Sequence, residues 1–308
     1  MEALLDNEIV RSYKRLSYTH WHALAEFVDN STQAYLDNRS VLDLSVAPGN
    51  FRLSIVIKYI REEDRLIIFD NSIGMSEAEL ERAMKIGMPP DDTSGRSRYG
   101  LGMKTAACWF GDLWELETKK LGETNSAKII FDVDRVAQGD RDLRLTRESH
   151  PVGEHFTKIE IQKLNRKFAG RTITKIKDYL RSFYRKDIHR YLDLYWGEEK
   201  LNWDDRLEIE EDLIKHNGAP LKYEFQFEVN GKDVTGWAGV FLRGGRSKAG
   251  FAMLHNDRVI RGWPDSYRPE SIFGEQRNDL INQRLVGELD LGAFDISHTK
   301  DQILFSAD

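Results

Sequence analysis

The chain has 308 residues, of which 40% are hydrophobic and 31% charged, and its formal net charge is −6. This length favours two domains, and the composition is typical of a soluble globular protein. The single cysteine, Cys108, excludes an internal disulfide framework and a zinc site with several cysteines. There is no apolar run of about eighteen residues to predict a spanning helix, and the charged N-terminus is not a signal peptide. We therefore expect a cytoplasmic protein.

The first elements predicted along the chain are a helix and two strands. Residues 19–38 carry a wide apolar face at helical spacing, with Thr19 as the N-cap. Alternating apolar residues predict a strand over 51–60. A second strand is predicted over 65–69, and it ends at Asp70.

The next elements surround a polar loop. Ser76, followed three residues later by Glu79, is the pattern of a capping box and predicts a helix start. The loop Met88–Tyr99 is rich in proline, aspartate, serine and arginine, and a helix is predicted after it over 100–110. Further strands are predicted over 113–119, 127–135 and 156–163.

The second half of the chain begins near Gly170 and opens with a helix predicted over 172–187. Later elements are strands over 222–229, 236–242 and 251–256, a short helix near 275–284 and a strand near 285–291. Helices mixed with antiparallel-looking strands favour α+β layers over a doubly wound sheet. Because the chain ends just after an apolar, strand-like segment, we expect it to be part of a longer protein.

Glu26 and Asn30 are the first residues that indicate chemistry. They lie four residues apart and therefore share one face of the predicted helix. A carboxamide oxygen is a hard ligand that suits Mg²⁺, and a carboxylate one turn earlier can orient or deprotonate a water. Taken alone, the pair is more often a solvated pair on an ordinary helix.

Asp70 ends an apolar strand and is followed by a turn that contains Gly74. A carboxylate in this place can accept a hydrogen bond from a ligand, and the amino group of adenine is a suitable donor. The ordinary alternative is a turn aspartate at the end of a strand, which is common.

A glycine-containing segment opens the helix predicted over 100–110. Gly100 and Gly102 leave backbone N–H groups exposed at the helix start, where the helix dipole favours an anion. Lys104 and Thr105 add donors. The spacing fits neither a Walker A motif nor the dinucleotide-binding fingerprint, and alone it is equally typical of a flexible loop before a helix.

The order of these blocks resembles the signature of the GHKL ATPases, the superfamily of gyrase B, heat-shock chaperone ATPases, histidine kinases and MutL. The segments THWHALAEFVDNS and DNSIGMSEAEL are most similar to the MORC branch. GEHFTKIEIQKL resembles the strand that follows, and HNDRVIRG and DISHTKDQ resemble the transducer domain. The resemblance implies an α+β fold, with a GHKL-type α/β sandwich and N-terminal arm over 1–168 and a smaller transducer-like domain over 169–308.

The resemblance also implies a role for each matching residue. Glu26 is implied as the general base, Asn30 as the Mg²⁺ ligand, and Asp70 as the adenine-binding residue, helped by a water and Thr157. Lys300 matches the catalytic lysine that reaches the terminal phosphate. The other implied nucleotide-binding residues are Gly74, Met75, Tyr99, Gly100, Leu101, Gly102, Met103 and Lys104.

The chain departs from the family pattern at Ser72, where the family usually has glycine. A Cβ at this position can crowd the base or conflict with a left-handed backbone. The sequence therefore defines the class of nucleotide better than it defines how tightly the protein binds that nucleotide.

The implied activity is Mg²⁺-dependent binding and slow hydrolysis of ATP, which drives conformational switching and closes a homodimer. In the related ATPases the arm before the first helix, here Met1–Tyr18, crosses to the partner, and the loop Met88–Tyr99 orders over the phosphates. The likeness to the MORC branch further implies a DNA-associated or defence role.

Two other functional classes and one further partner stay open. A histidine-kinase-type phosphotransferase is disfavoured because no phosphoacceptor helix is evident before the ATPase. A non-hydrolysing ATP-sensing module is disfavoured by Glu26, although Ser72 keeps it open. Nucleic acid is a partner suggested by the basic residues within 166–190, but Asp178 and Asp187 favour a solvated helix face.

Overall fold

The chain divides into two compact units in the computed structural model. The first unit is Met1–Thr174 with Tyr191–Leu201, and the second is Lys175–Arg190 with Asn202–Asp308. The division differs from a single border after residue 168, because Tyr191–Leu201 returns to the first unit. The structure describes residues 9–47, 50–85, 96, 102–140, 142–203, 211–274, 279–297 and 299–305. No helix in these described ranges is long and apolar enough to cross a membrane.

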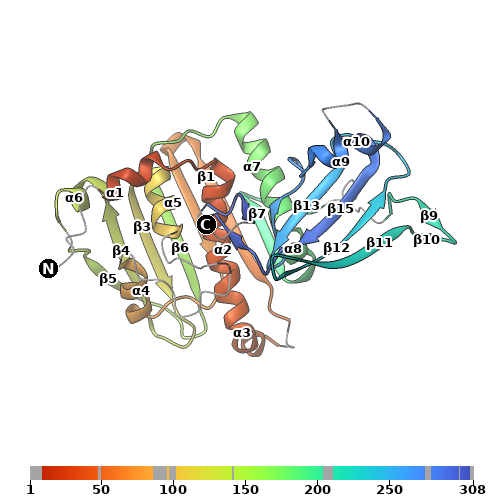
Figure 1. Ribbon diagram of the computed structural model, residues 1–308. Helices are drawn as coiled ribbons and strands as arrows, with labels where there is room; N and C mark the ends of the chain where they lie inside the picture. Colours follow the sequence, from red (N-terminus) through yellow and green to blue (C-terminus); the bar gives the residue numbers. More distant parts are fainter. Residues whose placement is uncertain are drawn as a thin grey trace. The chain divides into compact units, whose positions relative to one another are not determined.

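An eight-stranded sheet forms the centre of the first unit, in the order β5-β4-β3-β6-β2-β1-β7-β8 (Figure 1). All neighbouring strands run antiparallel except β1 and β7, which are parallel. The strands are β1 (Leu53–Ile60), β2 (Arg65–Asp70), β3 (Gly111–Lys119), β4 (Asn125–Asp132), β5 (Leu145–Ser149), β6 (Phe156–Leu164), β7 (Leu192–Trp196) and β8 (Glu199–Lys200).

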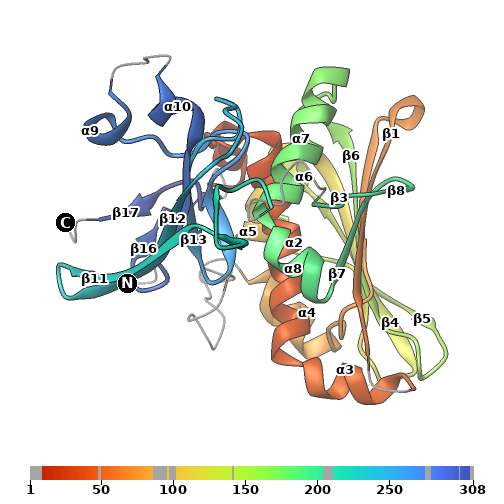
Figure 2. The same ribbon diagram turned by 90° about the vertical axis from the view of Figure 1, so that its right-hand side faces the viewer.

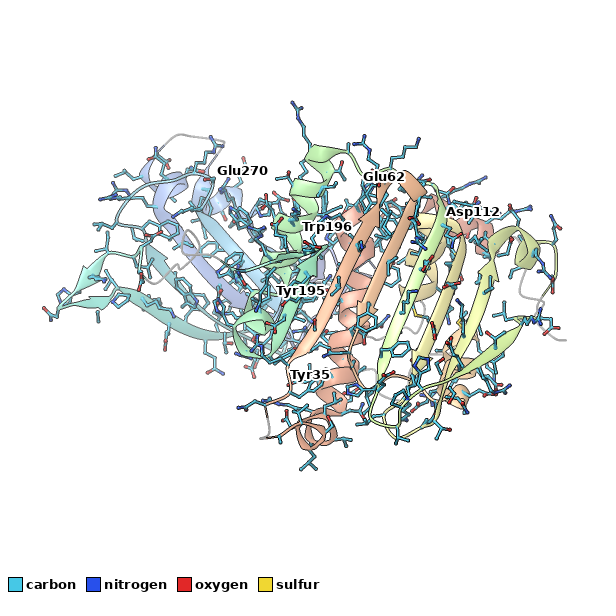
Figure 3. All side chains as sticks on the ribbon, turned by 180° about the vertical axis from the view of Figure 1, so that it is seen from behind. Tyr35, Glu62, Asp112, Tyr195, Trp196 and Glu270 are labelled. Atoms are coloured by element: carbon cyan, nitrogen blue, oxygen red, sulfur yellow. The ribbon has the colours of Figure 1, made fainter. Side chains whose placement is uncertain are left out.

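Helices cover one face of this sheet. They are α1 (Ile9–Ser12), α2 (His20–Asp37), α3 (Arg39–Ser45), α4 (Glu77–Met84), α5 (Gly102–Phe110) and α6 (Val133–Ala137). Figure 2 shows α2, α3 and α4 on one side of the strands. Figure 3 shows the opposite face, where strands lie in front of α2.

The alternation of side chains along the strands explains which face is covered. Leu53, Ile55 and Ile57 of β1 are fully buried, as are apolar residues of α2 such as Leu24 and Val28. Each such side chain contributes roughly 1.5–3 kcal/mol when removed from water. Apolar side chains of α2 and β1 therefore contribute to the core between the helices and the sheet.

Local signals set the helix starts. The side chain of Thr19 accepts a hydrogen bond from the backbone of His22, so α2 has the expected N-cap. The capping box of Ser76 and Glu79 is present at α4. The strand predicted over 127–135 was wrong at its end, because Asp132 caps a new helix, α6.

The second unit contains a five-stranded sheet in the order β11-β12-β15-β13-β14. These strands are β11 (Lys222–Val229), β12 (Lys232–Val240), β13 (Gly250–His255), β14 (Arg258–Arg261) and β15 (Leu285–Asp290), and its short helices are α9 (Glu270–Phe273) and α10 (Leu280–Arg284). Its main core gathers Val234, Met253, Ile260, Leu291, Phe294, Ile296 and Ile303.

The second unit also contains two short strand pairs. One joins β9 (Lys215–His216) to β10 (Ala219–Pro220), and the other joins β16 (Asp295–Ile296) to β17 (Ile303–Leu304). This combination of mixed sheets and packed helices confirms the α+β class.

The long helix predicted over 172–187 is divided. α7 (Gly170–Phe183) ends before Tyr184, and α8 (Arg185–Arg190) follows. Within α8, the guanidinium of Arg185 is buried and paired with Glu288 of β15. This basic residue is thus part of the interior of the second unit.

Candidate functional site

Asp70 lies at the end of β2, on the face of the sheet that the helices cover. Its exposed fraction is 5%, and its register partner in β6 is Thr157. One carboxylate oxygen accepts from Ser31 Oγ at 2.7 Å, and the other accepts from the backbone N–H of Ser72 at 2.9 Å. Burial raises the pKa of Asp70 to about 6, against the smaller effect of these two bonds. Among the described residues no Lys or Arg pairs with this carboxylate.

The turn after β2 is fixed against β3. Gly74 has a φ of +73°, and a Cβ on it would lie 1.9 Å from the carbonyl oxygen of Lys119, so only glycine fits. The N–H of Met75 donates to Thr118 Oγ1 at 2.9 Å. The backbone of Ser72 is not left-handed, so the serine is accommodated without strain.

Glu26 and Asn30 lie one turn apart on α2, as the sequence indicated. Asn30 is half-buried and lines a cavity, whereas the exposed fraction of Glu26 is only 3%. A Cβ on Gly102 would lie 2.1 Å from Glu26 Oε2. The first turn of α5 therefore lies directly against the Glu26 carboxylate, and a side chain at position 102 would require this carboxylate to move.

Lys104 is held by the end of α4. Its ammonium donates to the carbonyl oxygens of Ala83 and Lys85, both at 2.7 Å, and the side chain is buried. Burial lowers the pKa of Lys104 to about 8, and Cys108 opposes this weakly. The ammonium predicted to contact phosphate thus ties α5 to the last turn of α4.

A cavity of about 340 Å³ brings many of these residues together, and we call it the Asp70 cavity. Its volume is within the range of small-molecule sites. Of the residues predicted to bind nucleotide or metal, the lining includes Asn30, Asp70, Gly74, Met75, Gly102, Met103 and Thr157. The other lining residues are Phe27, Ser31, Gln33, Ala34, Asp37, Asn38, Ile68, Ser72, Ile73, Glu79, Arg82, Ala83 and Ile159.

Several predicted residues are not placed at this cavity. Tyr99, Gly100 and Leu101 lie outside the described residues. Lys300 belongs to the second unit, where its side chain is buried and its carbonyl oxygen accepts from Arg258. Its predicted approach to a phosphate stays a prediction.

The described part of the N-terminal arm packs on its own chain. Trp109 Nε1 of α5 donates to the carbonyl of Leu16 at 3.0 Å, and Arg166 donates to the carbonyl of Lys14 at 2.9 Å. Val10 is 2% exposed. Exchange of this arm with a partner would have to break these contacts.

Sequence reasoning missed the hydroxyl groups that support the site. Ser31 bonds Asp70, and Thr118 lies 3.2 Å from the hydroxyl of Thr157 as well as bonding Met75. A polar residue at an inward position of an apolar strand is a signal that could have found Thr118, because such a residue needs a partner. Ser31 carried no comparable signal.

The Asp70 cavity offers a carboxylate acceptor, a carboxamide oxygen and the N-terminal turn of α5. The side-chain oxygen of Asn30 is a ligand type that Mg²⁺ accepts, and Mg²⁺ usually takes few protein ligands and completes its shell with waters and phosphate oxygens. Gly102 brings the backbone of this turn against the Glu26 carboxylate, which occupies the space that a Cβ would take. These residues fit a small anionic ligand bound with a divalent cation.

Residues 18–164 match the family model of the histidine kinase-, DNA gyrase B- and HSP90-like ATPases. The match covers slightly less than half of the chain, from just before α2 to the end of β6. It includes Glu26, Asn30, Asp70 and Gly102, and it supports the GHKL superfamily for this segment. No curated protein matches the chain.

Proposed function

We propose that the first unit binds ATP in the Asp70 cavity and hydrolyses it slowly with Mg²⁺. The observation that carries this proposal is the buried carboxylate of Asp70, which lines the same cavity as Asn30 and Gly102. The family match over residues 18–164 supports the ATPase class.

Asp70 is proposed to select the base. Its carboxylate accepts a hydrogen bond from the exocyclic amino group of adenine, and Thr157 supports the contact beside it. Guanine presents a carbonyl oxygen at the same position, which a carboxylate repels. ATP should therefore bind more tightly than GTP.

The phosphates are proposed to lie at the start of α5. The N–H groups of Gly102 and Met103, with those of Tyr99, Gly100 and Leu101, surround the phosphate oxygens. Asn30 would hold Mg²⁺, which neutralises charge on the phosphates when it is bound.

Glu26 is proposed as the general base for hydrolysis. It orients a water in line with the terminal phosphate and accepts its proton, while the new P–O bond forms and the bond to the ADP oxygen breaks. The contact between its carboxylate and Gly102 supports this placement, because it brings the base next to the proposed phosphate site.

Two lysines are proposed to contact the phosphates of the bound nucleotide. Lys104 donates to the carbonyl oxygens of Ala83 and Lys85, so a phosphate bound by the same ammonium would be coupled to the end of α4. Lys300 of the second unit is proposed to contact the terminal phosphate and to distinguish ATP from ADP.

ATP is further proposed to close a homodimer, with the arm and the loop Met88–Tyr99 taking part. The likeness to the MORC branch suggests a DNA-associated or defence role for this switching. Both proposals rest on the resemblance of the sequence.

The binding and hydrolysis proposals are tested with Glu26→Gln and a control of the same chemistry, Glu62→Gln, at an exposed glutamate (Figure 3). We expect Glu26→Gln to bind ATP as the wild type does and to release phosphate at least about a hundredfold more slowly. Glu62→Gln should be normal in both respects. Unchanged phosphate release in Glu26→Gln would remove Glu26 as the base, and ATP binding without any wild-type hydrolysis would favour an ATP-sensing module.

The dimer proposal is tested by light scattering of Glu26→Ala with ATP, with ADP and without nucleotide. We expect twice the monomer mass only with ATP, and Lys300→Ala or deletion of residues 1–18 should weaken this dimer. The same mass in all three conditions would rule out ATP-dependent dimerisation.

A further inference from the structure

Ser72 carries a hydroxyl group that the described part of the chain leaves without a hydrogen bond. Its side chain is 2% exposed and lines the Asp70 cavity. The backbone N–H of Ser72 donates to Asp70, and its carbonyl oxygen accepts from His155 Nδ1 at 2.8 Å. Its Oγ is buried and has no hydrogen-bond partner among the residues that the structure describes.

The other hydroxyl groups beside Asp70 differ from that of Ser72. Ser31 Oγ donates to Asp70, and the hydroxyls of Thr118 and Thr157 lie within hydrogen-bond distance of each other. A buried hydroxyl without a partner is costly and is expected to have a reason. A ligand atom that enters the cavity can supply the missing partner.

We propose that Ser72 Oγ donates a hydrogen bond to a ring nitrogen of the base bound at Asp70, which makes Ser72 a second base-reading residue. The inference rests on the proposed binding of ATP. In adenine the amino group that Asp70 would hold is flanked by two ring nitrogens, N1 and N7, and both accept hydrogen bonds. Asp70 and Ser72 are already joined by the 2.9 Å bond between backbone and carboxylate, so one base can contact both side chains.

This contact requires the serine hydroxyl, so glycine at position 72 could not form it. The resemblance implies glycine at position 72, and glycine has no hydroxyl to donate. The pair of Asp70 as acceptor and Ser72 as donor matches the neighbouring donor and acceptor of adenine. The departure from the family pattern therefore adds a contact to the base.

The test compares ATP, 1-deaza-ATP and 7-deaza-ATP as ligands for the wild type and Ser72→Ala, with dissociation constants from calorimetry. Ser72→Ala keeps the Cβ and removes only the hydroxyl. We expect it to weaken ATP about tenfold, as the loss of one buried hydrogen bond does. The wild type should bind the analogue that lacks the accepting nitrogen about tenfold more weakly than ATP, and Ser72→Ala should not weaken that analogue further.

Two controls separate this contact from a structural role. Ser149→Ala, at an exposed serine of β5, should bind all three nucleotides as the wild type does. Ser72→Ala without nucleotide should have a Tm equal to or above that of the wild type, because no internal bond is lost. A lower Tm with equal weakening of all three nucleotides would indicate a structural serine and overturn the inference.

The remaining outcomes distinguish the inference from the proposed function. If Ser72→Ala binds every nucleotide like the wild type while Asp70→Asn loses ATP, the inference is wrong and the ATP site stands. If the wild type binds none of the three nucleotides, the proposed function is wrong, and the inference is overturned with it.

Discussion

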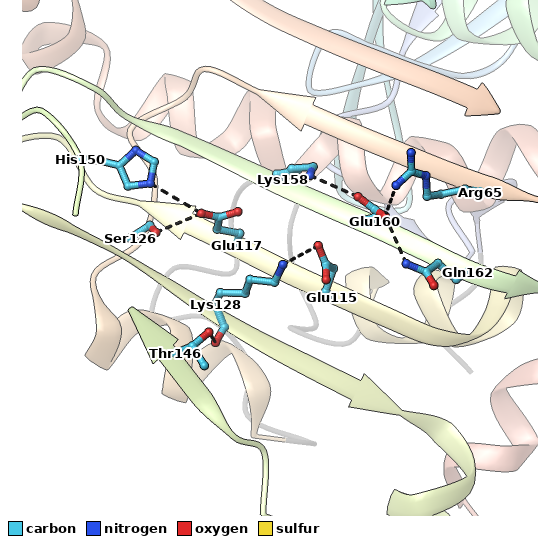
Figure 4. Close-up of polar contacts among 10 residues, drawn as sticks. All are labelled: Arg65, Glu115, Glu117, Ser126, Lys128, Thr146, His150, Lys158, Glu160 and Gln162. Carbon is cyan, nitrogen blue, oxygen red and sulfur yellow. Dashed lines mark hydrogen bonds and ion pairs between the residues drawn. The ribbon is translucent and has the colours of Figure 1, made fainter. Parts of the chain in front are cut away.

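Buried carboxylates on the two faces of the large sheet have different partners, and their pKa values shift in opposite directions. On the uncovered face, Glu160 of β6 accepts from Arg65 Nη1 at 2.8 Å and pairs with Lys158 at 3.2 Å, and Glu115 pairs with Lys128 (Figure 4). Burial opposes ionisation of Glu160, but these cations outweigh it and lower its pKa. On the covered face, the described hydrogen-bond partners of Asp70 are neutral, and burial raises its pKa to about 6.

This difference separates structural carboxylates from one that can take a ligand. A carboxylate between two cations is already neutralised, so another donor gains little from it. The carboxylate of Asp70 is desolvated and only partly compensated, so a donor that enters the cavity recovers part of the cost of burial.

The largest expected effect comes from removing the charge on the covered face. Asp70→Asn should weaken ATP binding by about a hundredfold, because a charge-assisted hydrogen bond is lost and an amide group now faces the amino group of the base. Glu160→Gln is the matched change on the uncovered face and should leave ATP affinity unchanged. Calorimetry with both variants measures this, and equal losses would mean that Asp70 does not contact the base.

The second effect is a pH dependence that belongs to Asp70. Below about pH 6 the carboxyl of the empty cavity is protonated, so ATP affinity should fall about tenfold for each pH unit below that value. The stability of the empty protein should change the other way. A buried acid whose pKa is raised from 3.8 to about 6 stabilises the fold at low pH, and this contribution is lost as pH rises from about 4 to 6.

Urea unfolding from pH 4 to 7 measures the stability effect, with Asp70→Asn as the control that cannot titrate. The shift corresponds to roughly 3 kcal/mol between the two limits. Parallel pH profiles for the wild type and Asp70→Asn would show that another group titrates.

The smallest expected effect compares two lysines. Lys104→Ala should lower the free energy of unfolding by about 2 kcal/mol, because two buried carbonyl oxygens at the end of α4 lose their donor. Lys128→Ala removes a partly exposed ion pair with Glu115 and should cost about 0.5 kcal/mol. Urea unfolding of the two variants measures the difference, and equal costs would contradict the proposed role of Lys104 at α4.

Local patterns in the sequence predicted the elements that form the cavity. Thr19 caps α2, and the capping box at Ser76 begins α4, because both signals involve residues within one helical turn. The sequence also predicted that Asp70 ends an apolar strand, and Asp70 is the last residue of β2. The α+β class followed from the same patterns.

Contacts between distant residues could not be predicted in this way. β7 follows α7 and α8 in the chain and pairs with β1, which is far from it in the sequence. Nothing in Leu192–Trp196 specifies that partner. The sequence shows that residue 104 is a lysine, but it does not show which groups its ammonium contacts. In the fold this ammonium donates to a carbonyl oxygen of α4. The missing partner of Ser72 Oγ is likewise a property of the assembled cavity.

The space shared by Gly102 and Glu26 also limits how the sequence can evolve. A Cβ at position 102 would collide with the Glu26 carboxylate where it now lies, so a larger residue there requires the carboxylate to move or to be absent. A lineage that shortens residue 26 removes the obstacle, and position 102 can then drift. Larger residues at position 102 in related genes would therefore mark lineages in which the glutamate side chain has moved or been lost.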